Sequence, residues 1–591
     1  MRTARAGELR SPDSGRQVRL AGWVAARRDH GGIRFFDLRD GSGLVQVVID
    51  PMLDAALADR AQALRDEFCV RVEGTVRIRP EGTANPELGS GEVEVAATGL
   101  EVLSTSDPLP FQIDDRAEID EMRRLEFRYL DLRRPRVARN LIARSRAMGA
   151  IRTSMLEQGF LEVETPTLVK STPEGARDVL VPSRHRPGSF YALPQSPQLF
   201  KQLLMVGGVE RYYQLARCYR DEDFRSDRQI EFTQLDLEGA FWDREGVFAA
   251  VEPVIGATVA ALRGESVSAP FPRLTWDEAM ARYGSDKPDL RFGMEIVDLG
   301  EVFAGSGFQA FASALAEGGM VAGIDAGRQD LSRSGLDSLV ESAKTLGARG
   351  LVWMVVEEGG VLRSPITKFL SPDEQAKVIG AFGAAPGDLL LIVADDRRKV
   401  LPVLGALRLD MGRPDGHSEL RFVWVVDFPV FAVDDEGGLS PEHHPFTAPH
   451  SVEEMRSSPQ TALARAYDLV VNGVELGSGS ERIHDPATQK EVFDILGISD
   501  EEAENRFGWF LRALRYGTPP HAGFAFGLDR LVMVLQDEPN IREVMPFPKT
   551  QSGFDPMTAS PGPVDDTQLV ELGIDLRPEV RVALTGEVPA G

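Results

Sequence analysis

Residues 219–236 read YRDEDFRSDRQIEFTQLD, and nine of these eighteen residues are charged. Apolar side chains, among them Phe232 and Leu235, lie between the charges. A solvated loop does not need such apolar residues, and a buried strand does not tolerate charges unless something pairs them. The stretch therefore predicts partly buried backbone around a charged, partly aromatic ligand.

Four side chains of this stretch suit the parts of a nucleotide. Arg220 and Glu222 lie two residues apart, so on a strand they share a face. Arg228 and Phe232 follow after a charged loop. An arginine suits an α-phosphate, a carboxylate suits an amino group, and a phenyl ring suits the face of a purine. An Arg-x-Glu pair is also a common structural salt bridge, and the stretch alone leaves that alternative open.

Two later stretches extend the prediction. In YDLVVNGVELGSGSERI, residues 467–483, Asp468 and Glu475 flank a strand-like run and offer hard oxygen ligands to one Mg²⁺. In GFAFGLDRLVMVL, residues 523–535, a glycine-spaced strand turns into a helix that begins near Arg530, which is placed to reach a second phosphate. The pattern GxxxxGK[ST] is absent from the sequence, so this is not a P-loop site.

Length and composition indicate the general class of protein that carries these motifs. The 591 residues predict several domains, and 42% hydrophobic and 27% charged residues are typical of a soluble globular protein. Two distant cysteines, Cys69 and Cys218, argue against a disulfide scaffold and favour a reducing cytoplasm. The N-terminus lacks the apolar core of a secretory signal, and no apolar run is long enough to span a bilayer. We therefore expect a cytoplasmic protein with no membrane partner.

The net charge of −25 argues against a nucleic-acid partner, but the charges are unevenly distributed. Residues 1–39 hold nine arginines and four acids, and residues 123–146 hold nine arginines and two acids. Arginine rather than lysine favours recognition of phosphates or bases, because guanidinium binds in planar, bidentate fashion. A solvated charged face is the alternative for either zone.

Residues 18–103 alternate with period two in five short runs separated by glycine-rich turns, which predicts a small closed barrel of the OB type. On such a barrel Phe35 and Gln46, beside Arg27 and Arg28, suit stacking and hydrogen bonding to splayed bases. Phe35 and Phe36 must face opposite sides of their strand, so a core position for Phe35 is the alternative.

The motifs together carry a resemblance to a known family. Pro166 after a helix and a strand, YRDED…RQIEFTQLD and GFAFGLDR resemble motifs 1, 2 and 3 of the class II aminoacyl-tRNA synthetases. STPEGARD (171–178), QSPQLFKQLLM (195–205), HHPFT (443–447) and YGTPPHAGFAFGLDRLVM are similar to the bacterial type of aspartyl-tRNA synthetase. The resemblance covers essentially the whole chain, including an insertion that asparaginyl and lysyl enzymes lack.

The resemblance implies a multidomain α+β fold: an OB-fold barrel, a catalytic domain built on an antiparallel sheet, and an inserted α+β domain. The implied division is 1–106 anticodon-binding barrel, 107–140 hinge, 141–287 catalytic domain with motifs 1 and 2, 288–418 bacterial insertion, 419–555 catalytic domain with motif 3, and 556–591 C-terminal extension.

The resemblance also implies residue roles. ATP would be bound by Arg220, Glu222, Phe232, Gln234, Glu475 and Arg530, of which Arg220, Glu475 and Arg530 would act in catalysis. Aspartate would be bound by Glu174, Gln198, Lys201, Asp236, His443, His444 and Arg482. Mg²⁺ would be held by Asp468 and Glu475. The tRNA anticodon would be read by Arg28, His30, Phe35, Gln46 and Gly82. For the two histidines, a capped loop is the structural alternative.

The implied reaction is ATP-dependent attachment of L-aspartate to tRNA through an aspartyl-adenylate. The loop RRDHGG, with His30 before two glycines, and Gly82 in PEGTANP resemble relatives with relaxed tRNA choice. They favour charging of both the aspartate and the asparagine tRNA, with an amidotransferase acting downstream. A strictly discriminating enzyme is the alternative.

A homodimer is expected through the motif 1 region. The helix 137–158 carries Leu141, Ile142, Met148, Ile151 and Met155, more apolar surface than one packing face needs. Two remoter alternatives are a non-catalytic OB-fold nucleic-acid-binding protein and an amide-forming relative of asparagine synthetase. The complete set of ATP residues argues against the first, and the barrel argues against the second.

Overall fold

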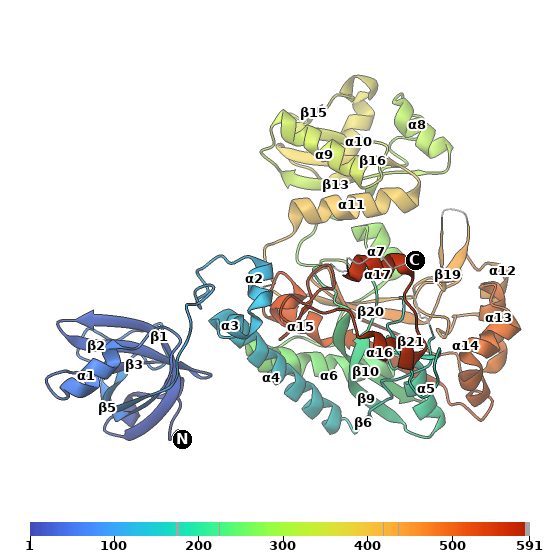
Figure 1. The fold of residues 1–591 in the computed structure, drawn as a ribbon. Helices are drawn as coiled ribbons and strands as arrows, with labels where there is room; N and C mark the ends of the chain where they lie inside the picture. The colour runs from blue at the N-terminus through green and yellow to red at the C-terminus, as the bar shows by residue number, and fades with distance from the viewer. Residues whose placement is uncertain (173–175, 224, 418, 435–436, 586–591) are drawn as a thin grey trace. The chain divides into compact units, whose positions relative to one another are not determined.

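The computed structural model describes residues 1–172, 176–223, 225–417, 419–434 and 437–585. Two compact units make up the chain: residues 1–139 with 556–558, and residues 140–555 with 559–591. Figure 1 traces both units, and each is described here by itself. The finer division predicted from the sequence stays a prediction.

The first unit is built on a closed five-stranded barrel in the order β1-β2-β3-β5-β4. Every strand pair in it is antiparallel except β3 with β5. Alternate side chains of β1, such as Val18, Leu20 and Val24, are buried in the barrel core, which is the period-two pattern of the sequence. The elements are η1 (Ala6–Glu8), η2 (Ser11–Asp13), β1 (Gln17–His30), β2 (Ile33–Asp40), β3 (Gly43–Ile49), α1 (Ala55–Gln62), β4 (Cys69–Ile78) and β5 (Val93–Ser104).

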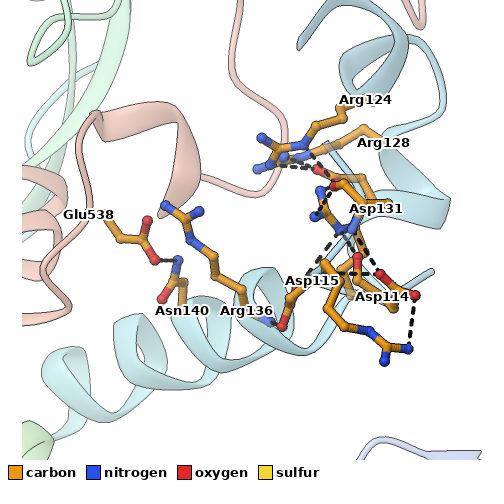
Figure 2. Close-up of polar contacts among 11 residues, drawn as sticks. Asp114, Asp115, Arg124, Arg128, Asp131, Arg136, Asn140 and Glu538 are labelled. Carbon is orange, nitrogen blue, oxygen red and sulfur yellow. Dashed lines mark hydrogen bonds and ion pairs between the residues drawn. The ribbon is translucent and has the colours of Figure 1, made fainter. Parts of the chain in front are cut away.

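The second arginine-rich zone forms an internal ion-pair cluster. It covers α2 (Glu121–Glu126), α3 (Arg128–Asp131) and the first part of α4 (Pro135–Glu157). The fully buried Asp131 pairs with Arg124 in bidentate fashion at 3.0 and 3.1 Å, and also with Arg128 and Arg134, as Figure 2 shows for the labelled residues. These three arginines pair with a carboxylate of the protein itself, so the prediction that this zone recognises phosphates is wrong for them.

An eight-stranded sheet forms the centre of the second unit, in the order β11-β17-β20-β21-β22-β10-β9-β6. All neighbours are antiparallel except β11 with β17 and β6 with β9. The strands are β6 (Leu161–Glu162), β9 (Arg211–Tyr219), β10 (Glu231–Ala240), β11 (Arg273–Thr275), β17 (Phe422–Val426), β20 (Ala466–Val471), β21 (Val474–Glu481) and β22 (His521–Gly527).

One face of this sheet is apolar and covered by helices. Leu235 and Leu237 of β10 join a core with residues of α4, α6 (Arg244–Arg263) and α15 (Leu528–Leu535). The alternating residues of β10, Gln234, Asp236 and Glu238, point to the opposite face, because successive side chains on a strand face opposite sides. The sheet therefore presents polar groups on the face that the helices leave open.

α6 is long and apolar enough, by length and composition, to span a membrane. It begins after Asp243, whose side chain accepts a hydrogen bond from the Gly246 backbone N–H, and it ends at Gly264 in the left-handed conformation. Its apolar side chains, Val247 and Val251 among them, are buried in the core of the second unit. The composition of α6 is therefore accounted for by its packing.

Only some of the apolar residues of α4 that predict a dimer are exposed. Ile151 and Met155 are fully buried in the core, so the prediction that they add excess apolar surface is wrong. Leu141 and Ile142 are 40% and 46% exposed, and Leu156 is 63% exposed. At its start, Asn140 is fully buried and donates a hydrogen bond to Glu538 (Figure 2).

The segment between β11 and β17 contains a module with its own five-stranded sheet, in the order β12-β13-β16-β14-β15. Alternate residues of β16 pack on two sides: Leu391 against α9 and α11, and Leu390 against α8 and α10. The elements are β12 (Val297–Asp298), α8 (Gln309–Ala316), β13 (Met320–Arg328), α9 (Arg333–Thr345), β14 (Val352–Glu357), β15 (Val361–Arg363), η3 (Thr367–Phe369), α10 (Pro372–Phe382), β16 (Asp388–Asp395) and α11 (Arg397–Gly412).

The second unit contains further short strands and helices. They are β7 (Leu180–Pro182), β8 (Phe190–Ala192), α5 (Gln198–Val206), α7 (Trp276–Tyr283), β18 (Phe431–Val433), β19 (Leu439–Pro441), α12 (Val452–Ser457), α13 (Pro486–Ile495), α14 (Asp500–Ala513), η4 (Ile541–Glu543), α16 (Asp566–Leu572) and α17 (Pro578–Thr585). The predicted multidomain α+β fold with an N-terminal OB barrel is confirmed.

Candidate active site

A cavity of about 990 Å³ lies over the polar face of the central sheet. Its walls come from β10, β21, β22 and α15, together with the loop 220–232 and segments near residues 287 and 413–417. All the predicted ATP- and aspartate-binding residues that the structure describes line it; Glu174 lies outside the described residues. Asp468 is buried and is hydrogen-bonded to His443, which does line the cavity.

Glu238 is the residue that organises one end of the cavity. It is fully buried, and its carboxylate accepts from Arg482 in bidentate fashion, with Nε at 2.9 Å and Nη2 at 3.1 Å. The Lys201 ammonium lies 3.1 Å from Glu238 and 2.8 Å from Asp236. The four side chains form a buried, charge-balanced cluster of two cations and two carboxylates.

The pKa values of this cluster follow from burial and from the pairing. Burial alone would raise the pKa of Glu238, but Arg482 and Lys201 outweigh it and lower the pKa to about 2. Burial dominates at Asp236 and raises its pKa, despite the contact with Lys201. Burial also works against the charged form of Arg482, yet Glu238 outweighs it and raises the pKa of the guanidinium.

A glycine makes room for Glu238. Gly523 of β22 lies directly opposite Glu238 of β10, and a Cβ at Gly523 would stand 1.7 Å from the Glu238 carboxylate. No side chain fits at this distance without displacing the carboxylate. The small residues in the GFAFG stretch are therefore explained in part by the acid that they face.

The pKa values of the two histidines are shifted in opposite directions. Burial disfavours a charged His443, but Asp468, whose Oδ1 lies 3.1 Å from His443 Nε2, outweighs burial and raises the pKa of His443. Burial and then Arg482 lower the pKa of His444 well below its ordinary value, so this ring is neutral.

His444 also caps its own loop, as the structural alternative predicted. Its Nδ1 accepts from the backbone N–H of Phe446 at 3.1 Å. Its Nε2 lies 2.7 Å from Nη1 of Arg482, which also donates to Ser480 Oγ at 2.7 Å. Arg482 is therefore held at the cavity wall by Glu238, Ser480 and His444 together.

The other end of the cavity is more exposed and holds several arginines. The Arg220 guanidinium lies 5.2 Å from the centre of the Phe232 ring. Arg530 donates to the backbone carbonyl of Glu475 at 2.8 Å and pairs with Asp227 at 3.0 Å.

The alternative left open by the sequence, a salt bridge between Arg220 and Glu222, is not the pair that the structure forms. Glu222 pairs with Arg228 at 3.1 Å instead, and Arg220 lies beside the ring of Phe232.

The predicted metal ligands fit a divalent cation that arrives with its own ligands. Asp468 pairs with Ser478 across β20 and β21, and Glu475 pairs with Val470, so the two carboxylates share the cavity face of adjacent strands. The ammonium of Lys287 already lies 2.8 Å from Glu475, which shows that a cation fits there. Among the described residues no group of three or more His, Cys, Asp or Glu forms a ready metal cage. Two carboxylates are typical of Mg²⁺ that is completed by substrate phosphates.

Several functional candidates were missed by the sequence analysis. Glu238 could have been found, because it continues the alternation of Gln234 and Asp236 on one strand face. Lys287 could not, since nothing local ties the segment GSDKPDL to a strand 188 residues later. The same holds for Asp529, which accepts from Arg144 and from the Thr233 backbone N–H and so fixes the start of α15.

On the barrel, the structure brings three of the predicted anticodon residues together. Arg28 pairs with Phe35 across β1 and β2, and its guanidinium lies 3.4 Å from the amide oxygen of Gln46 on β3. Phe35 is half-buried while Phe36 is in the core. His30 is exposed at the hairpin that Gly31 and Gly32 turn with positive φ, and Gly82 is exposed in the loop between β4 and β5.

Comparison with known proteins defines the class first. A family model described as tRNA synthetases class II (D, K and N) matches residues 120–551, and one described as OB-fold nucleic acid binding domain matches residues 18–103. The chain belongs to the class II tRNA synthetases of this group, with an appended OB-fold domain.

Full-length relatives narrow the class to one kind of enzyme. A protein of Salinispora arenicola named "Aspartate--tRNA(Asp/Asn) ligase" is 51% identical over 98% of this chain and 96% of that protein. One of the same name from Moorella thermoacetica is 52% identical over 96% of this chain and 95% of that protein. The particular family is thus that of the aspartate–tRNA ligases.

Solved structures agree on the fold. The asparaginyl-tRNA synthetase from Pyrococcus horikoshii complexed with asparaginyl-adenylate aligns with a TM-score of 0.58 at 20% identity, covering 93% of this chain and 98% of that one. The aspartyl tRNA synthetase from Entamoeba histolytica gives a TM-score of 0.56 at 18% identity, covering 91% and 89%.

Proposed function

We propose that this protein attaches L-aspartate to tRNA at the expense of ATP, through an aspartyl-adenylate. The observation that carries the proposal is the pair of buried cations, Arg482 and Lys201, that line one end of the cavity. An oxygen of a carboxylate that reaches the Arg482 guanidinium would accept from it. The position suits the side-chain carboxylate of aspartate.

Lys201 completes this carboxylate pocket. Its ammonium has three protons, of which two point to Asp236 and Glu238. The remaining contact of the ammonium, to the Leu237 carbonyl, is long at 3.5 Å, so a carboxylate oxygen of the substrate would compete for the third proton. The amide nitrogen of asparagine would place a donor against this donor, and a buried charged donor left unpaired costs at least about 1–3 kcal/mol.

The cavity's other residues suit adenylate formation. The α-carboxylate of aspartate attacks the α-phosphorus of ATP and pyrophosphate leaves. Arg220 would meet the developing charge on the α-phosphoryl group, and Arg530 the outer phosphates. Glu222 would accept from the adenine amino group while Phe232 contacts the ring. Bound Mg²⁺, held by Asp468 and Glu475, would supply further positive charge to the phosphates.

Remaining roles carried over from the family stay part of the proposal. Gln234 would complete the ATP pocket, and Gln198 the aspartate pocket. No protein nucleophile is needed, because positioning and electrostatics supply the rate. The 3′-terminal ribose hydroxyl of tRNA then attacks the adenylate.

We propose further that both the aspartate and the asparagine tRNA are substrates. The relatives' names support this, as does the exposed His30 on a glycine turn, whose ring can donate to or accept from either pyrimidine edge. An amidotransferase would then be needed downstream. A cytoplasmic location fits a partner of the translation machinery.

A homodimer through α4 is also part of the proposal. The exposed Leu141, Ile142 and Leu156 of this helix support it, together with Leu161 and Leu168, which are 57% and 52% exposed. Sedimentation at micromolar concentration tests it, and a monomer there would contradict it.

Aspartate-dependent exchange of pyrophosphate into ATP tests the first step. Exchange with aspartate and none with asparagine is expected, and no exchange with either would support the non-catalytic alternative.

Aspartylation of purified asparagine tRNA beside aspartate tRNA tests the proposal that both tRNAs are substrates. A kcat/KM ratio worse than about 10³, near 4 kcal/mol, would indicate a strictly discriminating enzyme.

A further inference from the structure

Lys287 lies on the cavity wall outside all the motifs that define the family site. It belongs to the segment between α7 and the inserted module, and that segment is firmly held. Ser285 Oγ accepts the Lys287 backbone N–H at 3.0 Å, and two residues on, the fully buried Asp289 pairs with Arg291 at 2.6 Å. Lys287 is therefore presented to the cavity from a fixed backbone.

The same segment packs against the turn that leads into β21. Asn472 and Gly473 form this turn, with φ of +52° and +80°. A Cβ at Gly473 would stand 3.4 Å from Asp289 Cβ. The backbone segment that carries Lys287 thus packs against the turn that leads to Glu475, which lies two residues beyond Gly473.

The ammonium of Lys287 meets Glu475 at 2.8 Å. Burial works against the charged form of Lys287, but Glu475, Asp286 and Asp468 outweigh it and raise the pKa of the ammonium. Lys287 accordingly stays a cation in the field of three carboxylates.

These carboxylates would repel one another without a cation. Burial raises the pKa of Asp286, and Asp468 and Glu475 raise it further. Burial likewise raises the pKa of Glu442, with contributions from Asp286 and Asp468. Two cations contact these acids directly: His443 lies 3.1 Å from Asp468, and Lys287 lies 2.8 Å from Glu475.

We propose that Lys287 is the resident counter-cation of the Asp468–Glu475 pair: its ammonium holds Glu475 in place in the ligand-free enzyme, and the divalent cation that enters with ATP displaces it. The inference rests on the proposed function only in naming Asp468 and Glu475 as the metal ligands. It makes Lys287 a positioning residue, whose effect is to weaken the binding of free metal relative to metal that arrives on the nucleotide.

The test is a titration of the full-length protein with Mn²⁺, without ATP, aspartate or tRNA, with free Mn²⁺ followed by electron paramagnetic resonance. Lys287→Met removes the competing cation, so the Kd for Mn²⁺ should fall at least about 10-fold, or about 1.4 kcal/mol. Lys287→Arg keeps the charge and should stay within about threefold of the wild type. Mn²⁺ should also raise the melting temperature of Lys287→Met more than that of the wild type.

Arg413→Met is the matched control. Arg413 lines the same cavity, but its guanidinium contacts the Asn472 carbonyl and Asp289 instead of Glu475. Its loss changes the net charge equally and should leave the Mn²⁺ affinity within about threefold. The double substitution of Lys287→Met with Glu475→Gln should abolish the gain.

Two outcomes would overturn the inference: Mn²⁺ binding to Lys287→Met that is no tighter than to the wild type, or an equal gain in Arg413→Met. If Lys287→Met does not fold, Lys287→Gln carries the same expectation. Because no substrate is present, failure here leaves the aspartylation proposal standing, and absence of aspartate-dependent exchange would leave the Mn²⁺ result standing.

Discussion

The two ends of the cavity hold their charges in different ways. At the aspartate end, Lys201, Asp236, Glu238 and Arg482 are each at most 3% exposed and are paired with one another. At the phosphate end, the pairs Arg530–Asp227, Arg228–Glu222 and Lys287–Glu475 have side chains that are 19–38% exposed.

This difference matches what each end must do. A buried, fully paired cluster cannot rearrange cheaply, so it presents fixed donors and can select one side chain. Half-exposed pairs cost little to break, so their cations can leave a carboxylate for a phosphate or give way to a metal ion. Selectivity needs the first kind of pairing, and binding a highly charged, exchangeable nucleotide needs the second.

The largest effect is expected from removing the centre of the buried end. Glu238→Gln leaves Lys201 and Arg482 with one fewer carboxylate, so we expect about 3–5 kcal/mol loss of unfolding free energy and loss of aspartate-dependent exchange. Urea denaturation measures the first. The control is Glu231→Gln on the same strand, whose partly exposed pairs with Arg217 and Lys549 should be worth less than about 1 kcal/mol. Equal losses of unfolding free energy in the two variants would contradict the view that buried pairs and exposed pairs contribute differently to stability.

Arg482→Lys sharpens the comparison within the buried end. A lysine cannot keep the two contacts to Glu238 and also donate toward His444, so kcat/KM for aspartate should fall by about 2–4 kcal/mol, or 30-fold to 1,000-fold. The KM for ATP should stay within about threefold, because the phosphate end does not depend on this pairing. A KM for aspartate within threefold of the wild type, about 0.65 kcal/mol, would contradict the assignment of Arg482.

Lowering the pH should destabilise the buried end of the cavity, because it protonates Glu238. Its folded pKa of about 2 lies below the ordinary value of 4.5, so its stabilising contribution is complete above pH 4.5 and is lost as the pH falls toward 2. The gap in unfolding free energy between the wild type and Glu238→Gln should therefore narrow by about 1 kcal/mol from pH 6 to pH 3.5. Denaturant titrations at the two pH values measure this, and a gap that widens on acidification would mean that Glu238 is not held as an anion.

The smallest effect is expected at the phosphate end. Asp227→Asn removes the half-exposed partner of Arg530 but leaves its bond to the Glu475 carbonyl, so stability should change by less than about 1 kcal/mol. The kcat/KM for ATP should change by less than about fivefold, and less at high salt, because exposed charges are screened. A loss as large as that of Glu238→Gln would show that this end is as rigid as the other.

Much of the molecule was predictable from local sequence. The period-two runs of residues 18–103 dictate the barrel strands, because alternate apolar residues must face one core. The charged and aromatic residues of 219–236, with the stretches around Glu475 and Arg530, identify the cavity, since few other structures need such residues beside buried apolar ones. Here residue types and short spacings carry the information.

Which charges pair was decided only by the tertiary structure. Glu238, Lys201 and Arg482 come from β10, α5 and the residue that follows β21, and Lys287 reaches Glu475 across the whole inserted module. The arginines around Asp131 look in sequence like a surface for phosphates, yet they surround a buried carboxylate. A charge in a sequence shows only that a partner is required. The fold decides whether that partner is a ligand or another part of the chain, because pairing depends on distances that the local sequence does not contain.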